Sequence, residues 1–339
     1  MLTWKRVFKT PPTVLTVVGM AKNVGKTVTM NYIQNMLYAE NRVMGLTSIG
    51  RDGESFDALT NLKKPPVVVL PGTLVATAEK AIVDWAKWEH LQDTEVTTSM
   101  GKIVIVKAKE NANVVLAGPS KNSQLRELWD SVKGWGADCM LIDGAFDRQS
   151  AADPAVGRQV ILATGATLSR NLQELVNRTQ ARVEQLTLPK CEAKYQVLAQ
   201  QYQEKAIFIN ESGNTKAALT TLLLSEKEWQ KLLSEPRKVL ILKGAIGEGL
   251  GEALVKAGNT PVVILDNGSK LFLPAATWRR LMLKGVQFYV RQPIELLGVT
   301  INPTFPGGEG LEPDTLLREM GEALHPIPVA DIMREKLYV

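Results

Sequence analysis

The sequence predicts an α/β fold: a mostly parallel sheet with helices on both faces, followed by a smaller C-terminal α/β domain. Short apolar runs rich in β-branched residues recur along the chain, and such runs are typical of buried strands. Helical patterns lie between many of them, which is the alternation that a parallel sheet requires. The chain has 339 residues, of which 45% are apolar. It is therefore long enough for two domains, each with its own core.

The apolar runs predict strands, and the segments with helical spacing between them predict helices. The predicted strands cover 14–18, 43–48, 66–70, 103–106, 113–117, 139–142, 159–163, 206–209, 238–242, 261–265, 286–290 and 297–301. The predicted helices cover 26–40, 74–91, 121–134, 169–187, 214–233, 247–257, 275–283 and 311–322. The stretch 93–117 holds strand-like runs without a helix between them, so we expect an antiparallel insertion or a sheet edge there.

A change of composition suggests where the two domains meet. A polar region with helical spacing, 190–205 and 211–236, precedes a new set of strands. We therefore place the boundary near 213–237. The prediction is a nucleotide-binding domain over 1–213 and a C-terminal α/β domain over 237–339.

Charge and cysteine content exclude several classes of protein. The net charge of +5 is spread along the chain without a basic block, which argues against a nucleic-acid partner. Two cysteines and two histidines leave no cluster with metal-ligand spacing and no disulfide framework. The N-terminal segment does not read as a signal peptide, and no stretch approaches the ~20 apolar residues of a membrane span. We expect a soluble cytoplasmic protein that does not bind membranes.

The most informative motif is G-M-A-K-N-V-G-K-T at residues 19–27. It lies between a predicted strand and a predicted helix, and this order of elements forms a phosphate-binding loop, or P-loop. Backbone N–H groups of the loop and the first helical turn would face the phosphates of a nucleotide. Lys26 would reach the β- and γ-phosphates, and the hydroxyl of Thr27 would bind Mg²⁺. The residues expected to bind nucleotide here are Asn23, Val24, Gly25, Lys26, Thr27 and Val28.

The spacing of this motif differs from the common one. Five residues rather than four separate the first glycine from the Gly-Lys pair. The alternative is a strand–helix turn whose glycines only allow close packing. Lys22 is a second cation inside the loop and a candidate catalytic residue, since it can stabilise charge on the γ-phosphate as an arginine finger does. Otherwise Lys22 is a solvated loop residue.

Acidic residues follow two other predicted strands. The buried strand 139–142 ends at Asp143, where a P-loop protein carries the carboxylate that holds Mg²⁺. In the loop after the second predicted strand, Asp52, Glu54 or Asp57 can supply a further Mg²⁺ contact or position a water molecule. Asp143 and, from that loop, Asp52 are the candidates for catalysis and for metal binding. A turn or helix-cap role is the alternative for Asp143, and a plain Asp-Gly turn is the alternative for Asp52.

Asn210 follows the predicted strand 206–209 and is a candidate for contact with the nucleotide base. The alternative is a turn asparagine, because Glu211, Ser212 and Gly213 follow it directly.

The loop resembles that of dethiobiotin synthetase-like proteins, whose motif G-T-D-T-x-V-G-K-T-V has the same five-residue gap. The resemblance covers about residues 12–210 and implies the SIMIBI class of P-loop NTPases. It implies that Lys26 and Thr27 bind phosphate and Mg²⁺, that Asp143 takes the family's acidic role and that Asn210 contacts adenine. The sequence departs from the family where Gly50-Arg51-Asp52 replaces the substrate-binding Lys-Pro pair and where Ala21 and Lys22 replace Asp and Thr. Biotin synthesis is therefore disfavoured.

A looser resemblance, over most of the chain, is to the small reactivase subunit associated with lysine 5,6-aminomutase. It rests on the stretches D-G-A-F-D-R-Q-S at 143–150, I-L-A-T-G-A at 161–166 and V-T-I-N-P at 299–303. This resemblance implies two protein partners: an aminomutase that uses cobalamin and pyridoxal phosphate, and an ATPase subunit similar to mismatch-repair proteins.

Three functions are open from the sequence. The first is an accessory protein that binds and hydrolyses ATP with Mg²⁺ and acts on a protein partner. The second is an ATP-dependent ligase or kinase of the synthetase type, and the third is a nucleotide-binding module without turnover. Intact Lys26, Thr27 and Asp143 favour the first two. The sequence leaves the choice between ATP and GTP open, and it is compatible with a homodimer.

Overall fold

The computed structural model describes residues 13–49, 67–144, 157, 159–210, 212–234 and 238–339. The chain divides into two compact units. The first unit is formed by Met1–Val176 and Leu296–Val339, and the second by Asn177–Glu295. The second unit is thus inserted in the sequence of the first.

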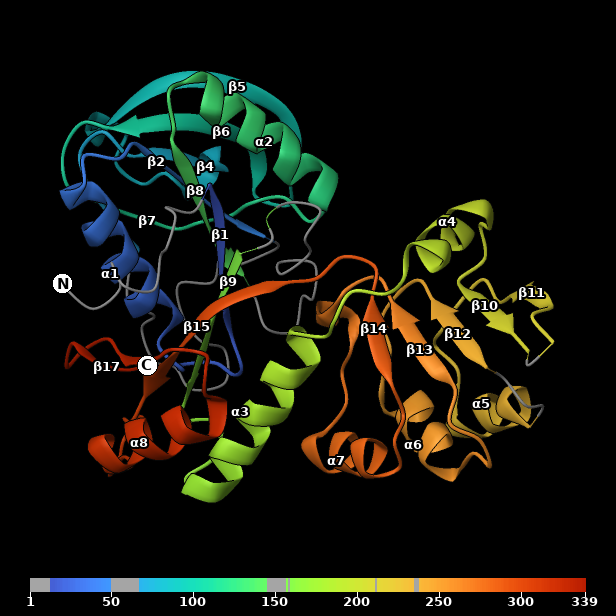
Figure 1. Ribbon diagram of the computed structural model, residues 1–339. Coiled ribbons are helices and arrows are strands. Elements are labelled where there is room, and N and C mark those ends of the chain that lie inside the picture. Colours follow the sequence, from blue (N-terminus) through green and yellow to red (C-terminus); the bar gives the residue numbers. More distant parts are fainter. Residues whose placement is uncertain (1–12, 50–66, 145–156, 158, 211, 235–237) are drawn as a thin grey trace. The chain divides into compact units, whose positions relative to one another are not determined.

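The first unit is built on a ten-stranded sheet (Figure 1) with the order β17-β16-β15-β9-β1-β8-β2-β4-β6-β5. The successive pairs β9–β1, β1–β8, β8–β2 and β2–β4 are parallel, whereas β4–β6 and β6–β5 pair antiparallel at one edge. The strands are β1 (Val14–Gly19), β2 (Met44–Ile49), β4 (Leu74–Ala78), β5 (Trp88–Thr98), β6 (Gly101–Ala108), β8 (Cys139–Gly144), β9 (Gln159–Gly165), β15 (Glu295–Asn302), β16 (Val329–Asp331) and β17 (Lys336–Tyr338). The large, mostly parallel sheet and the antiparallel edge confirm the predicted α/β class.

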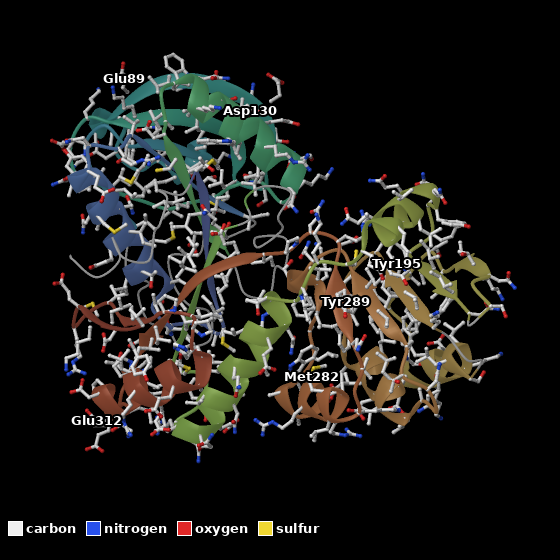
Figure 2. The ribbon with its side chains drawn as sticks, viewed as in Figure 1. Glu89, Asp130, Tyr195, Met282, Tyr289 and Glu312 are labelled. Atoms are coloured by element: carbon white, nitrogen blue, oxygen red, sulfur yellow. The ribbon has the colours of Figure 1, made fainter. Side chains whose placement is uncertain are left out.

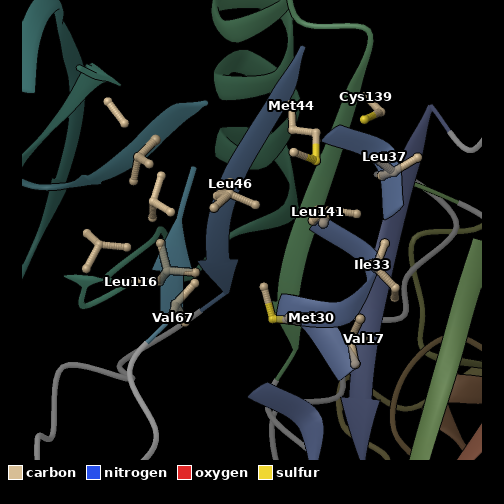
Figure 3. Close-up of a cluster of buried hydrophobic side chains, with 14 of the residues drawn as sticks. Val17, Met30, Ile33, Leu37, Met44, Leu46, Val67, Leu116, Cys139 and Leu141 are labelled. Carbon is tan, nitrogen blue, oxygen red and sulfur yellow. The ribbon is translucent and has the colours of Figure 1, made fainter. Parts of the chain in front are cut away.

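Helices cover both faces of this sheet. Helix α1 (Lys26–Ala39) packs on one face through Met30, Ile33 and Leu37 (Figure 3). Helix α2 (Asn122–Gly134) packs on the other, where a side chain at Gly45 would lie 2.5 Å from Cγ1 of Val132. The remaining elements are α8 (Pro313–Leu324), the start of α3 (Leu172–Leu186), the short turns η2 (Glu79–Ala81) and η3 (Trp85–Lys87), and a two-stranded sheet of β3 (Val67–Val69) and β7 (Ala112–Val114).

The core between α1 and the sheet explains why these segments form these elements. Alternate residues of β1, β2 and β8, among them Val17, Leu46 and Leu141, point into one buried cluster with α1 (Figure 3). The helical residues in the cluster recur at the three- and four-residue spacing of one helix face. This core holds β1 and α1 together, and therefore also the loop that joins them.

The second unit has its own five-stranded sheet, with the order β11-β10-β12-β13-β14. Strands β12, β13 and β14 are parallel, and β10 pairs antiparallel with β12 and β11. The strands are β10 (Ala206–Ile209), β11 (Thr215–Ala218), β12 (Val239–Leu242), β13 (Val262–Leu265) and β14 (Phe288–Val290). The helices are α4 (Ala193–Gln201), α5 (Glu226–Leu233), α6 (Glu248–Lys256) and α7 (Ala275–Leu283), with the short turn η4 (Gly268–Lys270).

Two apolar clusters cover the two faces of this second sheet. Trp229 of α5, Leu250 of α6 and Trp278 of α7 pack on one face. Helix α4 packs on the other, where its Tyr195 and Tyr289 of β14 both contact the buried cluster (Figure 2). The second unit is therefore a small α/β unit that is covered on both sides.

The predicted division into residues 1–213 and 237–339 is corrected by the strand pairing. Strand β10 pairs with β12 in the second unit, so the predicted boundary falls inside that unit. Strand β15 lies beside β9 in the ten-stranded sheet, so residues 296–339 belong to the first unit. Composition along the chain does not indicate that residues 296–339 return to the first sheet, because this return depends on which strands pair.

Two predicted helices are also corrected. The segment 74–91 forms β4, η2, η3 and the start of β5, although its alanines and charged residues suit a helix. Pairing of β4 with β2 and β6 overrides that local preference. In the predicted helix 214–233, only α5 is helical, and β11 precedes it.

Candidate functional site

The loop between β1 and α1 turns through two residues in the left-handed region. Asn23 and Gly25 both have positive φ angles, 60° and 93°. Gly25 is the N-cap of α1 and carries no side chain that caps the helix. The N–H groups of Lys26, Thr27 and Val28 have no acceptor within the helix, because they belong to its first turn. Together with the helix dipole, these groups favour an anion at this end of α1.

Gly19, the last residue of β1, is required by the path of the Lys26 side chain. A Cβ atom at residue 19 would lie 2.8 Å from Cγ of Lys26 and 2.9 Å from its Cδ. The same atom would lie 2.9 Å from Cγ2 of Val24. Only glycine leaves this space open, and the lysine stem crosses it on the way to the neighbouring strand β8.

Lys26 and Asp143 meet at the carboxyl end of the sheet. Nζ of Lys26 donates a hydrogen bond to the carbonyl oxygen of Gly144 at 3.0 Å and lies 3.3 Å from Oδ1 of Asp143. β1 and β8 are parallel neighbours in register, and Val17 is paired with Asp143. The two side chains are only 21% and 12% exposed, so the pair is largely removed from water. The structure thus brings together the two residues that the sequence placed in one site.

The loop is also anchored from its other side. The Met20 amide donates to the carbonyl oxygen of Ala163 in β9 at 2.9 Å, and the Val24 side chain is buried. These contacts tie the loop to the strand that flanks β1 opposite β8. The loop is therefore held in shape before any ligand arrives, which lowers the entropic cost of binding.

Asn302, which the sequence analysis did not select, is the residue that holds the loop from the C-terminal part of the chain. Its Nδ2 donates to the carbonyl oxygen of Asn23 at 3.0 Å. Its Oδ1 accepts from the amide of Thr304 at 3.1 Å and from the hydroxyl of Thr304 at 2.7 Å. The available signal was the apolar run 297–301 ending in Asn-Pro, but that run was assigned to a separate domain.

A buried polar contact joins the same two elements. The hydroxyl oxygens of Thr29 in α1 and Thr300 in β15 lie 2.9 Å apart, and both residues are buried. A buried hydroxyl is costly unless it is hydrogen-bonded, so each threonine stabilises the other. This pair fixes β15 against the first turns of α1.

The other predicted residues fall in three places. Lys22, Asn23, Val24, Gly25, Thr27 and Val28 lie in the loop or the first turn of α1 with Lys26, and Lys22 is exposed on its outer side. Asp52 lies outside the described residues. Asn210 belongs to the second unit, where its side chain accepts a hydrogen bond from the Asn214 amide at 2.8 Å in the turn between β10 and β11. Its contact with a base stays a prediction.

The donor set at the loop fits a hard cation such as Mg²⁺. Oδ1 of Asp143 is buried and accepts no hydrogen bond within the described residues, although Lys26 lies beside it. Hydroxyl and carboxylate oxygens are the ligands that Mg²⁺ prefers, and it binds few protein groups because it retains water and takes phosphate oxygens. Thr27 and Asp143 are the residues that would hold it. The described residues, those of this loop included, contain no group of three or more His, Cys, Asp or Glu side chains that could hold a metal ion.

Comparison with known proteins adds no assignment. The chain matches no family model, and no curated protein matches it significantly. Within the described residues, no helix has both the length and the apolar character that crossing a bilayer requires.

Proposed function

We propose that the protein binds a nucleoside triphosphate, ATP in the first instance, together with Mg²⁺ at the loop between β1 and α1, and that it hydrolyses this nucleotide. The observation that supports the proposal most is the junction of Lys26, Asp143 and the uncapped N-terminus of α1. A triphosphate with Mg²⁺ requires a lysine charge, a carboxylate and a row of backbone amides without helical acceptors. All three lie here at the carboxyl end of the sheet.

Each group has a distinct task in this proposal. The first-turn amides of α1 donate hydrogen bonds to the β-phosphate oxygens. Lys26 exchanges its hydrogen bond to Gly144 for a γ-phosphate oxygen, and Asp143 and the Thr27 hydroxyl hold Mg²⁺. When bound, the metal ion neutralises charge on the phosphates. Lys22, on the outer side of the loop, stabilises the charge that develops on the γ-phosphoryl oxygens during hydrolysis.

The resemblances described above extend the proposal to a protein partner. They favour an accessory protein whose nucleotide cycle acts on an aminomutase dependent on cobalamin and pyridoxal phosphate. The alternative is a ligase or kinase that transfers the phosphoryl group to a small molecule.

Phosphate release separates these functions. We would measure it for the purified protein with Mg²⁺ and ATP, alone, with a cell extract freed of small molecules, and with the small-molecule fraction. Lys26→Ala is the test variant. Lys107→Ala, which removes an exposed lysine from β6 of the same unit, is the matched control.

The accessory function is supported if the extract freed of small molecules raises turnover, and if this turnover is lost in Lys26→Ala but kept in Lys107→Ala. Turnover that rises with small molecules supports a ligase or kinase. Nucleotide binding without phosphate release under any condition contradicts the hydrolysis proposed here, and equal activity in Lys26→Ala and the control contradicts the site.

A further inference from the structure

The loops that follow β9 and β15 border the same edge of the sheet as the loop after β1. From β1 the chain continues through α1 to β2, on the β8 side of the sheet. From β9 it returns to the first sheet as β15, on the opposite side. The pair β1 and β9 is therefore the point where the strand order reverses, and ligands of open α/β sheets bind in the crevice outside the carboxyl ends at such a point.

Backbone contacts bring these three loops together. The Ala166 amide, just after β9, donates to the carbonyl oxygen of Asn302 at 2.9 Å. Glycine is required at residue 165, because a Cβ atom there would lie 2.4 Å from the same oxygen. Asn302 in turn bonds the carbonyl oxygen of Asn23. The segments after β9 and β15 thus form a continuous wall beside the phosphate-binding loop.

The segment after β15 is held in one conformation by its own backbone. The Leu311 amide donates to Pro303 at 2.8 Å, and the Gly308 amide donates to Phe305 at 3.3 Å. The segment after β9 is ordered too: the hydroxyl of Ser169 accepts from the Asn171 amide at 3.0 Å. Phe305 and Arg170 are therefore presented by turns with internal hydrogen bonds.

Arg170 and Phe305 form a stacked pair on this wall. Cζ of Arg170 lies 3.7 Å from the centre of the Phe305 ring. Phe305 is partly buried under the guanidinium, and Arg170 is exposed. Within the described chain, the Arg170 guanidinium forms no ion pair with a carboxylate, so a flat, cationic surface faces outward. Phe305 follows Asn302 by three residues, which limits the separation of their Cα atoms to about 11 Å.

We propose that the outer face of the Arg170 guanidinium, supported by Phe305, is the platform on which the base of the bound nucleotide stacks. The inference rests on the proposed function, since it extends the ligand from the phosphate-binding loop along the wall. Bases stack on aromatic rings and on the planes of arginine side chains, and such stacking does not depend on the identity of the base. The platform accordingly selects a nucleotide over a bare polyphosphate without choosing between adenine and guanine.

Calorimetric titration with two Mg²⁺-bound ligands tests this proposal: a non-hydrolysable ATP analogue and inorganic tripolyphosphate. Arg170→Ala removes the platform, Arg170→Lys keeps the charge but loses the plane, and Phe305→Leu keeps the apolar bulk but loses the ring. Arg318→Ala, which removes another exposed arginine of the first unit, is the matched control. We expect the affinity of Arg170→Ala and Arg170→Lys for the ATP analogue to fall by about 5- to 150-fold, with a smaller loss in Phe305→Leu. The affinity for tripolyphosphate should stay unchanged in all four variants.

Several outcomes overturn the platform. Full affinity for the analogue in Arg170→Lys assigns the residue a purely electrostatic role. Equal losses for the analogue and tripolyphosphate assign it to the shape of the phosphate-binding loop. Unchanged affinities in every Arg170 and Phe305 variant, while Lys26→Ala loses both ligands, refute the platform and leave the proposed function intact. A wild-type protein that binds neither ligand contradicts both.

Discussion

The buried pair of Thr29 and Thr300 provides a quantitative test of the way the C-terminal segment returns to the first unit. The two residues are separated by 271 positions, and their hydroxyl oxygens are 2.9 Å apart. Thr29 is 1% exposed and Thr300 is 2% exposed, so neither hydroxyl has access to water. Replacing one by valine leaves the other buried without this partner, which costs about 1–3 kcal/mol in the free energy of unfolding.

The double variant is expected to lose less free energy of unfolding than the two single variants lose together. Thr29→Val with Thr300→Val replaces both polar groups by methyl groups of similar shape, and such a replacement is close to neutral. The interaction energy from the double-mutant cycle should therefore be at least about 1 kcal/mol. Thr97→Val, at an exposed position of β5, is the matched control and should change stability by less than about 0.5 kcal/mol.

Hydrogen exchange followed by mass spectrometry is the suitable assay, because it reports on α1 alone. The free energy of opening is read from the amides of peptides that cover 26–39, so unfolding of the second unit does not obscure the result. If the two single losses are additive in the double variant, the hydroxyl groups do not interact. The packing of β15 against α1 described here would then be wrong.

Three further predictions concern chemistry and pH. Asp143→Asn should lower the hydrolysis rate by roughly 10²-fold while nucleotide affinity falls far less, and equal losses in rate and affinity would make Asp143 a structural residue. Lys22→Ala should reduce turnover, measured with an activating partner present, and leave ATP binding nearly intact; wild-type turnover would exclude a catalytic role. Hydrogen bonds from Arg334 and Lys336 lower the pKa of Asp314 to about 2 from 3.8. The stabilisation of the contact between α8 and β17 is thus complete above about pH 4 and is lost as the pH falls through 2. Hydrogen exchange of α8 should show this loss in the wild type and a smaller pH dependence in Asp314→Asn, where only the N-cap carboxylate of Glu312, whose pKa is also lowered by its hydrogen bonds, still titrates.

The position and the turn of the loop between β1 and α1 could be predicted from sequence because their determinants are local. Gly19, Gly25 and Lys26 lie within eight residues; Gly19 is required by the neighbouring Lys26 side chain, and Gly25 by its positive φ. Asp143 was predictable for a related reason, since a buried strand that ends in a carboxylate places that carboxylate at the carboxyl edge of the sheet. The structure brings Lys26 and Asp143 together as expected.

The domain boundary and Asn302 could not be predicted in this way, because both depend on pairing between distant strands. The run 297–301 has the composition of any buried strand, and nothing in it shows that its neighbour is β9 rather than β14. If β15 is assigned to the second domain, the sequence does not predict that Asn302 lies near the loop between β1 and α1. The strand before Asn210 was placed in the wrong domain for the same reason: β10 was counted with the first sheet, whereas it pairs with β12.

The segment 74–91 illustrates how tertiary pairing overrides local preference. Its residues A-T-A-E-K-A favour a helix by intrinsic propensity. β4 nevertheless pairs with β2 on one side and with β6 on the other, and all five of its residues are buried. The gain from burying both faces of a strand exceeds the helical preference of a few residues.

The most direct test of the central claim is a calorimetric titration of the wild-type protein and Lys26→Ala with a non-hydrolysable ATP analogue and Mg²⁺. Among the described residues, Lys26 supplies the lysine charge that lies against Asp143 at the end of β8, and its removal leaves the loop backbone in place. We predict saturable binding to the wild-type protein and no measurable binding to Lys26→Ala, with hydrogen exchange of α1 unchanged by the substitution. Equal affinity of both proteins for the analogue would contradict the assignment of this loop as the nucleotide site.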